Sequence, residues 1–598
     1  MREYSIPSLA RVPASEGIAD VVFRRAESEP ATVVLRRQLP DGGWRDVTAG
    51  EFGTEVAALA SGLIAAGVGR GDRIAIMSRT RYEWTLADYA IWAAGAVTVP
   101  VYETSSAEQV EWILRDSAAR ALFAEAEACE RTVAAIQPRL PDLERIWRIG
   151  ELDAVARGGA GVSADILAER LASTLADDLA TIVYTSGTTG RPKGCELSHR
   201  CLLAGVRNAV AVLPELFGQR GASTLLFLPL AHVFARIIQI GVLDVGAVLG
   251  HWPDPNTVAA GLAGFSPTFV LAVPRVFEKI YYNAERTASS SKFGARLFAA
   301  ATQAAVEWSE ALAAGRKPGP LRRARHAAFE MLVYRRLRAA AGGRVRYAIS
   351  GGGPLNPRLG HFFRGAGITA LEGYGLTEAA GAATVNRPGS NKVGTVGLPL
   401  PGMAVRIAAD GEILLRGSSV FRGYWRNPGA TRSVLDSDGW LHTGDAGDLD
   451  AEGALQVTGR QKELIVTAGA INVAPAVLEE RMRGKPLISH CLVVGNGRPY
   501  VACLVALDPD ELDRWKRQHQ RQPDAGAGDL AADPDLLAEV QEIVDEANKA
   551  VSRAESIRRF RILAVDFTEA AGQLTPSDKV CRGVVARDFA ADIEALYA

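Results

Sequence analysis

The N-terminal part of the chain alternates between two hydrophobic periods. Apolar residues recur with helical spacing from 54 to 66, and residues 73–77 (RIAIM) then predict a strand with a continuous apolar run from 74. The same order repeats at 84–94, which has helical spacing, and at 97–101, which is again apolar and β-branched. Helices that alternate with buried strands predict an α/β layer on a mostly parallel sheet.

The alternation continues into the middle of the chain, where residues 293–341 have a long helical pattern. We expect further strands at 181–184, 224–230, 268–273, 345–350 and 368–371. Ligands of such sheets bind beyond the carboxyl ends of the strands. The residues that directly follow these strands are therefore candidates for a binding site.

The C-terminal part has a different pattern. Short strands with Gly, Asp and Pro turns fill 393–458, and a smaller α+β unit follows Lys462. In that unit we expect strands at 464–466, 491–494, 500–507 and 561–565, a surface loop at 523–533 and a helix at 536–551. The predicted fold class is α/β, with a large N-terminal α/β domain (1–460, including a small β subdomain at about 393–458) and a smaller mobile C-terminal α+β lid domain (461–598).

The loop that follows the strand at 181–184 has the composition of a phosphate-binding loop. Its sequence from Tyr184 to Gly194 contains several glycines, four hydroxyl side chains and Lys193. Glycine permits the positive φ angles that turn several backbone N–H groups toward one anion. The Walker pattern is excluded, because Gly190 is followed by Arg-Pro-Lys-Gly and not by Gly-Lys-Ser/Thr. The alternative is an ordinary glycine-threonine surface turn.

Two further strand-to-glycine junctions predict other walls of one cleft. Residues 351–354 (GGGP) follow one strand, and residues 372–378 (EGYGLTE) follow the next. Tyr374 offers an aromatic face to a base, and Glu378 is an oxygen ligand suited to Mg²⁺ beside phosphates. Asp445 and Arg460 follow short strands and are placed to hold a ribose, although a turn Asp and a surface Arg are the simpler interpretation.

Composition and charge narrow the class. The 598 residues are 48% hydrophobic and 23% charged, with a net charge of −1, so no overall field attracts nucleic acid or an anionic membrane. Six cysteines without paired spacing fit a reducing cytoplasm. The N-terminus has no secretory signal, and the apolar window 225–249 is interrupted by His232, Arg236, Gln239 and Asp244, so we expect a cytoplasmic protein. The basic segment 316–346 is either a solvated helix face or a peripheral docking surface for a membrane or a phosphate-rich ligand.

Five motifs in order resemble the adenylate-forming superfamily, which includes acyl-CoA synthetases, firefly luciferase and nonribosomal-peptide adenylation domains. They are 184–194, 373–378, 442–445, 458–463 and 574–579, and the resemblance covers nearly the whole chain. Within that superfamily, the chain looks most like bacterial long-chain fatty-acyl-CoA synthetases of the actinobacterial kind. The stretches that carry this closer resemblance are 83–85, 101–106, 228–236, 273–279 and 371–378.

The resemblance implies roles for individual residues. The loop residues Thr185, Ser186, Gly187, Thr188, Thr189, Gly190 and Lys193 would bind the ATP phosphates, and Thr185 with Glu378 would hold Mg²⁺. Gly352, Gly353, Glu372, Gly373, Tyr374 and Thr377 would surround the nucleotide, while Asp445 and Arg460 would bind its ribose. Lys579 would reach the carboxylate and the α-phosphate, Lys462 would be the hinge of the lid, and Gly469 would lie along the pantetheine path of CoA.

His232 and Asp578 leave alternatives open. His232 is a gate between nucleotide and acyl pocket by resemblance, or a core or capping residue by its apolar surroundings. Asp578 directly precedes Lys579, where long-chain relatives often have an uncharged residue. Its carboxylate either raises the pKa of the lysine or faces solvent.

The activity implied by the resemblance is that of an ATP-dependent long-chain fatty acid:CoA ligase. The fatty acid would be activated as acyl-AMP with release of pyrophosphate, and CoA would then take the acyl group; the apolar segments 227–234 and 267–277 are candidates for an acyl tunnel. The alternatives are a fatty acyl-AMP ligase, or a stand-alone adenylation enzyme that loads a carrier-protein thiol. A non-catalytic nucleotide-binding protein is disfavoured by the presence of Lys579 and Glu378.

Overall fold

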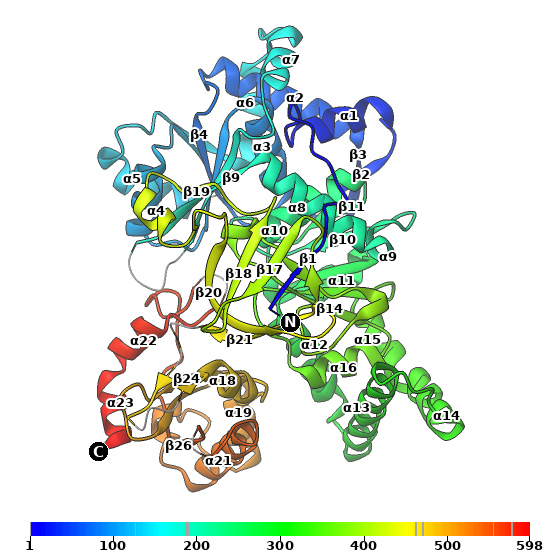
Figure 1. Ribbon diagram of the computed structural model, residues 1–598, viewed down its shortest axis with the longest axis vertical. Helices are drawn as coiled ribbons and strands as arrows, with labels where there is room; N and C mark the ends of the chain where they lie inside the picture. Colours follow the sequence, from blue (N-terminus) through cyan, green and yellow to red (C-terminus); the bar gives the residue numbers. More distant parts are fainter. Residues whose placement is uncertain are drawn as a thin grey trace.

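The computed structural model describes residues 2–125, 127–185, 191–460, 463, 465–468, 472–553, 555–575 and 578–598. Figure 1 shows a large body, a small β unit (yellow) and a C-terminal unit (orange to red) that lies beside the β unit, away from the N-terminal sheet. The predicted α/β class is confirmed by several sheets that are covered by helices.

The first sheet of the body carries the predicted N-terminal alternation. Its strand order is β19 (Gly423–Tyr424), β9 (Lys193–Ser198), β8 (Leu179–Thr185), β5 (Val97–Val101), β4 (Arg73–Met77), β6 (Ala121–Ala124) and β7 (Arg145–Arg148). Strands β8 to β7 run parallel, while β8 and β9 form an antiparallel hairpin.

Helices cover both faces of this sheet, which explains why its central strands β4, β5 and β6 are largely apolar. Ile74 and Ile76 of β4 face the hydrophobic core that includes α2 (Ala49–Ala65) and α3 (Tyr82–Ala93). Ala75 and Met77 face the opposite core, which includes α4 (Ala107–Ser117) and α5 (Glu127–Ile136). A strand that is buried on both faces requires apolar residues at successive positions.

Two further sheets complete the body. One has the order β12 (Phe269–Ala272), β13 (Tyr347–Ser350), β14 (Thr369–Tyr374), β15 (Thr384–Val385) and β16 (Leu398–Pro399); the other has β10 (Ser223–Leu226), β11 (Val248–His251), β2 (Val33–Gln38) and β3 (Trp44–Thr48). The strand predicted at 224–230 ends at Leu226, because the chain turns there before α10 (Val233–Val245).

The remaining helices of the body are α1 (Asp20–Ser28), α6 (Leu152–Gly158), α7 (Ala164–Ala172), α8 (His199–Val212), α9 (Pro214–Phe217), α11 (Val258–Phe265), α12 (Pro274–Ala288), α13 (Lys292–Ala313), α14 (Pro320–Phe329), α15 (Arg335–Ala340), α16 (Pro357–Gly365) and α17 (Pro428–Arg432). The helical pattern at 293–341 is confirmed, and α13 and α14 project from the body at the lower right of Figure 1.

The polar residues that interrupt the apolar window 225–249 are partly explained by a buried ion pair. Arg236 of α10 donates to both carboxylate oxygens of Asp88 on α3 at 2.8 and 2.9 Å, and Gln239 donates to the same carboxylate. A buried charge of this kind requires its partner. Within the described residues, no helix has the length and apolar character needed to cross a membrane.

The antiparallel β unit contains one strand that the sequence did not reveal. Its order is β1 (Glu3–Ser5), β17 (Met403–Ile407), β18 (Glu412–Gly417), β20 (Leu441–Leu449) and β21 (Leu455–Arg460). The N-terminal strand β1 pairs with β17, about 400 residues away in sequence, so no local pattern could indicate it.

The C-terminal unit, called the lid below, has β22 (Ile465–Val466) paired with β23 (Asn472–Val473) and a sheet of β24 (Ile488–Val494), β25 (Val501–Leu507) and β26 (Ile557–Ile562). Its helices are α18 (Pro475–Arg483), α19 (Pro509–Gln518), α20 (Ala527–Leu530), α21 (Pro534–Asn548), α22 (Arg582–Asp588) and α23 (Ala590–Tyr597). The strand predicted at 561–565 was wrong, because it lies at 557–562. The loop predicted at 523–533 contains α20, whose Leu530 is buried in the lid core.

Candidate active site

A connected cleft of about 2610 Å³ is lined by both the body and the lid. The predicted site residues along it are Thr185, Lys193, His232, Gly352, Gly353, Glu372, Gly373, Tyr374, Thr377, Glu378, Asp445, Arg460 and Lys579. They come from the carboxyl ends of parallel strands, from the β unit and from the lid, as expected for ligand sites of such sheets. The predicted Ser186, Gly187, Thr188, Thr189, Gly190, Lys462 and Gly469 lie outside the described residues.

The proposed ribose side of the cleft is a chain of polar contacts between three strands. The phenol of Tyr374, at the end of β14, donates to Asp445 Oδ2 at 2.6 Å. Asp445 is the direct cross-strand neighbour of Arg460, whose Nε lies 3.3 Å from Asp445 Oδ1. Burial raises the pKa of Asp445, while Arg460 and Tyr374 lower it. The carboxylate is therefore held in a fixed orientation at the cleft wall.

The proposed phosphate side is built on the β8–β9 hairpin. Thr185 pairs with Lys193 across the hairpin, and Thr185 Oγ1 lies 3.5 Å from the Lys193 carbonyl oxygen. The Lys193 ammonium lies 5.1 Å from the ring centroid of Tyr424, within the range of a cation–π contact. The Tyr424 phenol in turn donates to Glu378 Oε1 at 2.7 Å. The Thr185 hydroxyl, the Lys193 ammonium and the Glu378 carboxylate are thus linked at this end of the cleft.

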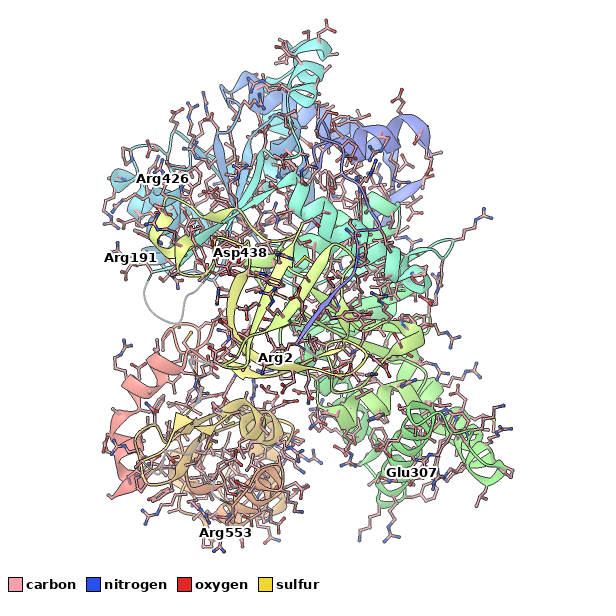
Figure 2. The ribbon with its side chains drawn as sticks, viewed as in Figure 1. Arg2, Arg191, Glu307, Arg426, Asp438 and Arg553 are labelled. Carbon is pink, nitrogen blue, oxygen red and sulfur yellow. The ribbon has the colours of Figure 1, made fainter. Side chains whose placement is uncertain are left out.

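The base of the hairpin loop is fixed by Trp112 of α4. Its indole N–H donates to the Pro192 carbonyl at 2.8 Å, and the Arg191 guanidinium lies 4.7 Å from its ring centroid. Figure 2 places Arg191 at the outer edge of the molecule, below Arg426 in the view.

The glycine-rich junctions bring backbone close to the cleft. Gly352 has a φ of +81°, which disfavours side chains, and a Cβ at Gly375 would lie 2.4 Å from the Gly381 carbonyl oxygen. The Glu372 carboxylate accepts hydrogen bonds from the backbone N–H groups of Leu355 and Gly394 at 3.2 and 3.3 Å. Burial raises the pKa of Glu372 to about 7. Glu372 therefore braces the loops of this wall.

His232 is the N-cap residue of α10, as the capping alternative foresaw. Its Nδ1 accepts a hydrogen bond from the Phe234 N–H at 3.1 Å, which leaves the proton of the neutral ring on Nε2. Burial, together with the nearby Lys579 charge, lowers the pKa of His232 to about 4. A neutral imidazole at the cleft thus lies within the electrostatic reach of the lid lysine.

Lys579 projects from the lid into the cleft, where solvent still reaches it. Desolvation by the cleft walls and the charge of Arg460 lower the pKa of Lys579, while the carboxylates of Asp445 and Glu463 oppose this shift. The Asp578 carboxylate is 40% exposed and forms an ion pair with Arg275 of α12, a contact that neither alternative included.

Apolar residues on and beside α8 and α10 line part of the cleft, which is called the apolar branch below. Its lining includes Val206, Ala209, Val210, Leu213, Phe217, Ile237, Ile238 and Gly241. The expected segments 227–234 and 267–277 contribute only in part, through residues such as Val233, Phe234 and Leu271. Helix α8 was missed, because a helix that lines a pocket has the same apolar spacing as one that packs in a core.

Comparisons with known proteins give the family. The model of the AMP-binding enzyme family matches residues 22–425, and that of the AMP-binding enzyme C-terminal domain matches 462–598. The long-chain-fatty-acid–CoA ligase FadD15 of Mycobacterium tuberculosis is 50% identical over 602 residues, which covers 100% of both chains. The long-chain-fatty-acid–CoA ligase heimdall of Drosophila melanogaster is 30% identical, covering 93% of this chain and 90% of its own.

The fold agrees with solved structures of related enzymes. The anthranilate CoA ligase AuaEII, in complex with anthranoyl-AMP, superimposes with a TM-score of 0.73 at 21% identity, covering 97% of this chain and 99% of its own.

Proposed function

Because the chain belongs to the AMP-binding enzyme family, we propose that it is an ATP-dependent long-chain fatty acid:CoA ligase. In the first step, the fatty carboxylate attacks the α-phosphorus of ATP, and pyrophosphate leaves. In the second step, the CoA thiolate attacks the acyl carbonyl, and AMP leaves. The observation that carries the proposal is one cleft in which Lys579 approaches Asp445 and His232 beside an apolar branch.

The nucleotide is proposed to lie between the glycine junctions and the β unit. The backbone at Gly352, Gly353 and Gly373 leaves room for a flat base, and the Tyr374 ring offers a face for stacking. Asp445 is placed to accept hydrogen bonds from the ribose hydroxyls, and Arg460 fixes the orientation of that carboxylate. Thr377 completes this wall.

The phosphates are proposed to lie over the β8–β9 loop, with Thr185, Lys193 and the loop residues 186–190 as their ligands. Thr185 and Glu378 supply the hard oxygen atoms that Mg²⁺ prefers, which fits the metal to this donor set. When bound, Mg²⁺ would neutralise charge on the phosphates. Lys193 of the β8–β9 hairpin and Lys579 of the lid both line this cleft, so each is available to add a cation where negative charge increases during phosphoryl transfer.

The acyl chain is proposed to occupy the apolar branch along α8 and α10. Each buried methylene contributes about 0.8 kcal/mol of transfer free energy, so a deep apolar pocket favours long chains. The neutral His232 lines the same cleft as this branch and the nucleotide wall, and we propose it as the gate between them. Because the pKa of His232 is about 4, its ring is neutral at pH 7 and adds no second positive charge near Lys579.

The second step is proposed to require a rotation of the lid. One lysine cannot hold the α-phosphate while a thiol approaches the same carbonyl, and a lid with two positions resolves this conflict. We place the boundary between body (1–460) and lid (461–598) at Lys462, as the hinge, with Gly469 on the CoA path. Relative to wild type, Lys462→Pro should then slow thioester formation more than adenylation. An unchanged rate in both steps, or the same slowing of both, would contradict the hinge.

The direct test of the activity is incubation with palmitate, ATP, Mg²⁺ and CoA. Formation of palmitoyl-CoA, AMP and pyrophosphate is expected. Accumulation of acyl-AMP without thioester would favour a fatty acyl-AMP ligase, and transfer only to a carrier-protein thiol would favour the stand-alone adenylation enzyme.

A peripheral membrane contact is proposed for the projecting helices α13–α15. Phe293, Leu321 and Met331 are 76%, 83% and 73% exposed, and they lie among arginines 316, 322, 323, 335 and 336. Exposed apolar side chains within a basic surface suit an anionic lipid surface. Vesicles with phosphatidylglycerol should sediment the protein, and Leu321→Asp should weaken this; equal sedimentation with neutral vesicles would contradict the proposal.

A further inference from the structure

Helix α12 presents a row of polar side chains to the lid. Arg275, Glu278 and Tyr282 are spaced three and four residues apart, so they lie on one face of the helix. All three line the cleft between body and lid. The apolar side chains of the same helix, Phe277 and Tyr281, are buried in the body. The helix is therefore anchored in the body and offers its polar face to the lid.

Each member of this row has a counterpart on the lid. The Tyr282 phenol donates to the backbone carbonyl of Gly484, at the end of α18. Glu278 lies within the electrostatic reach of Arg483; burial raises the pKa of Glu278, and the Arg483 cation opposes this rise. Arg275 forms an ion pair with Asp578. The row thus contacts two separate segments of the lid, at 483–484 and at 578.

The Arg275–Asp578 pair is supported from within the lid by His490 on β24. His490 Nε2 lies 3.4 Å from both Arg275 Nη1 and Asp578 Oδ1. His490 Nδ1 lies 2.8 Å from Asp566 Oδ1, which fixes the plane of the ring. The His490 side chain is almost fully buried, so the lid part of this network has little freedom to rearrange.

Hydrogen bonds among Thr575, Asp578 and Lys579 connect this network to the lysine in the cleft. The Asp578 N–H donates to the Thr575 carbonyl at 2.8 Å, the Thr575 N–H donates to the Lys579 carbonyl at 2.8 Å, and the Lys579 N–H donates to Thr575 Oγ1 at 3.1 Å. Asp578 has a φ of +61°, a conformation that aspartate tolerates better than most residues. Contact of the Asp578 side chain with α12 therefore also fixes the backbone of Lys579, from which the lysine side chain extends into the cleft.

We propose that Arg275 is a positioning residue for adenylation, which holds Lys579 in the cleft by docking Asp578 onto α12. This inference rests on the proposed function, since it assigns a role in the first of the two steps. When the lid rotates for thioester formation, Lys579 withdraws and the Arg275–Asp578 pair must break. The pair therefore favours the first step and opposes the lid position of the second.

The pair is about 40% exposed on both sides, so its effect is modest. Exposed ion pairs contribute up to about 1 kcal/mol, which corresponds to a change of roughly twofold to fivefold in an equilibrium between lid positions. The effect should also fall as ionic strength rises, because screening weakens exposed charge pairs.

The experiment measures the two half-reactions separately for Arg275→Ala and Asp578→Asn. In each variant, ATP–pyrophosphate exchange with palmitate should fall roughly twofold to fivefold, mainly in kcat. Thioester formation from supplied palmitoyl-AMP and CoA should stay equal or become faster. The double variant should be no slower than either single variant, since each single change already removes the same Arg275–Asp578 contact. Arg275→Lys, which keeps the charge, should retain most of the exchange activity.

The matched control is Arg553→Ala. Arg553 is exposed on the side of the lid that faces away from the body (Figure 2), so this change removes an arginine charge without touching α12. Thermal unfolding of each variant checks that the fold is intact. Equal loss of both half-reactions, strictly additive single changes, or a loss that ignores salt would overturn the positioning role. A wild-type enzyme that makes no palmitoyl-AMP would instead overturn the proposed function.

Discussion

The Tyr374 phenol and the Asp445 carboxylate are 71 residues apart in sequence, and they share a hydrogen bond of 2.6 Å. Tyr374 belongs to a sheet of the large body, and Asp445 to the antiparallel β unit. The bond therefore joins the wall proposed for the base to the carboxylate proposed for the ribose. These two recognition elements act as one unit, so a change at either residue should weaken the binding of ATP.

Tyr374→Phe tests this unit while keeping the aromatic ring. The change leaves the buried Asp445 without its phenolic donor, and a hydrogen bond to a charged group contributes roughly 1.5–3 kcal/mol. We expect the KM for ATP to rise roughly tenfold, with a smaller effect on the KM for palmitate. Tyr500→Phe is the control, because the phenol of Tyr500 bonds only to the Leu596 carbonyl within the lid among the contacts described. An unchanged KM for ATP would refute the link.

Glu378→Gln tests the proposed metal ligand. Glutamine keeps the size and the contact with Tyr424, but it removes the charge that Mg²⁺ prefers. We expect ATP–pyrophosphate exchange to require a several-fold higher Mg²⁺ concentration for half-maximal rate. Titration of Mg²⁺ at fixed ATP measures this directly, and an unaltered titration curve would remove Glu378 from the site.

Ala209→Phe tests the acyl branch beside α8. The larger side chain fills space in the pocket, and each excluded methylene forfeits about 0.8 kcal/mol. In a series from octanoate to stearate, kcat/KM should fall for the long acids and stay nearly constant for octanoate, which serves as the internal control. A uniform loss for all chain lengths would place the pocket elsewhere.

Glu480→Gln tests a charge at the interface between body and lid. Burial raises the pKa of Glu480 to about 7 from its usual 4.5, with Arg483 opposing and Glu278 assisting. The folded form thus holds a proton that the unfolded form releases, so the stability from this group is present below pH 4.5 and is lost as the pH rises through 7.

Glutamine abolishes this loss, because it cannot ionise. Relative to wild type, Glu480→Gln should be stabilised by roughly 2–3 kcal/mol at pH 8 and by little at pH 5. Thermal unfolding at both pH values measures the difference. Glu542→Gln, on the exposed face of α21, is the control. A difference between mutant and wild type that is the same at both pH values would contradict this account.

Sequence patterns were sufficient to predict the bounds of strands that are buried along their length and end at sharp turns. Strands β4 and β5 have the predicted bounds, because each is a short, mostly apolar run that follows a turn containing glycine. Strand β26 was misplaced, since Arg558, Arg559 and Arg561 interrupt it with exposed charges while an apolar run continues beyond it. These charges hid the strand from a search for apolar runs.

Site residues that belong to a sequence motif could be predicted. Residues whose role depends on a contact with a distant part of the chain could not. Asp578 was noticed beside Lys579, yet its partner Arg275 lies 303 residues away, so only the fold could reveal the pair. Tyr424 was missed for the same reason: nothing in its neighbourhood indicates that it bonds Glu378 and receives Lys193. Tertiary contacts of this kind leave no local pattern.

The central claim is that Lys579 of the lid completes the adenylation site and withdraws afterwards. Lys579→Ala, compared with the exposed lid variant Lys549→Ala, tests it most directly. Loss of a cation aimed at developing charge should reduce ATP–pyrophosphate exchange roughly 100-fold, while thioester formation from supplied palmitoyl-AMP should change less than about threefold. Equal loss of both half-reactions would contradict the account.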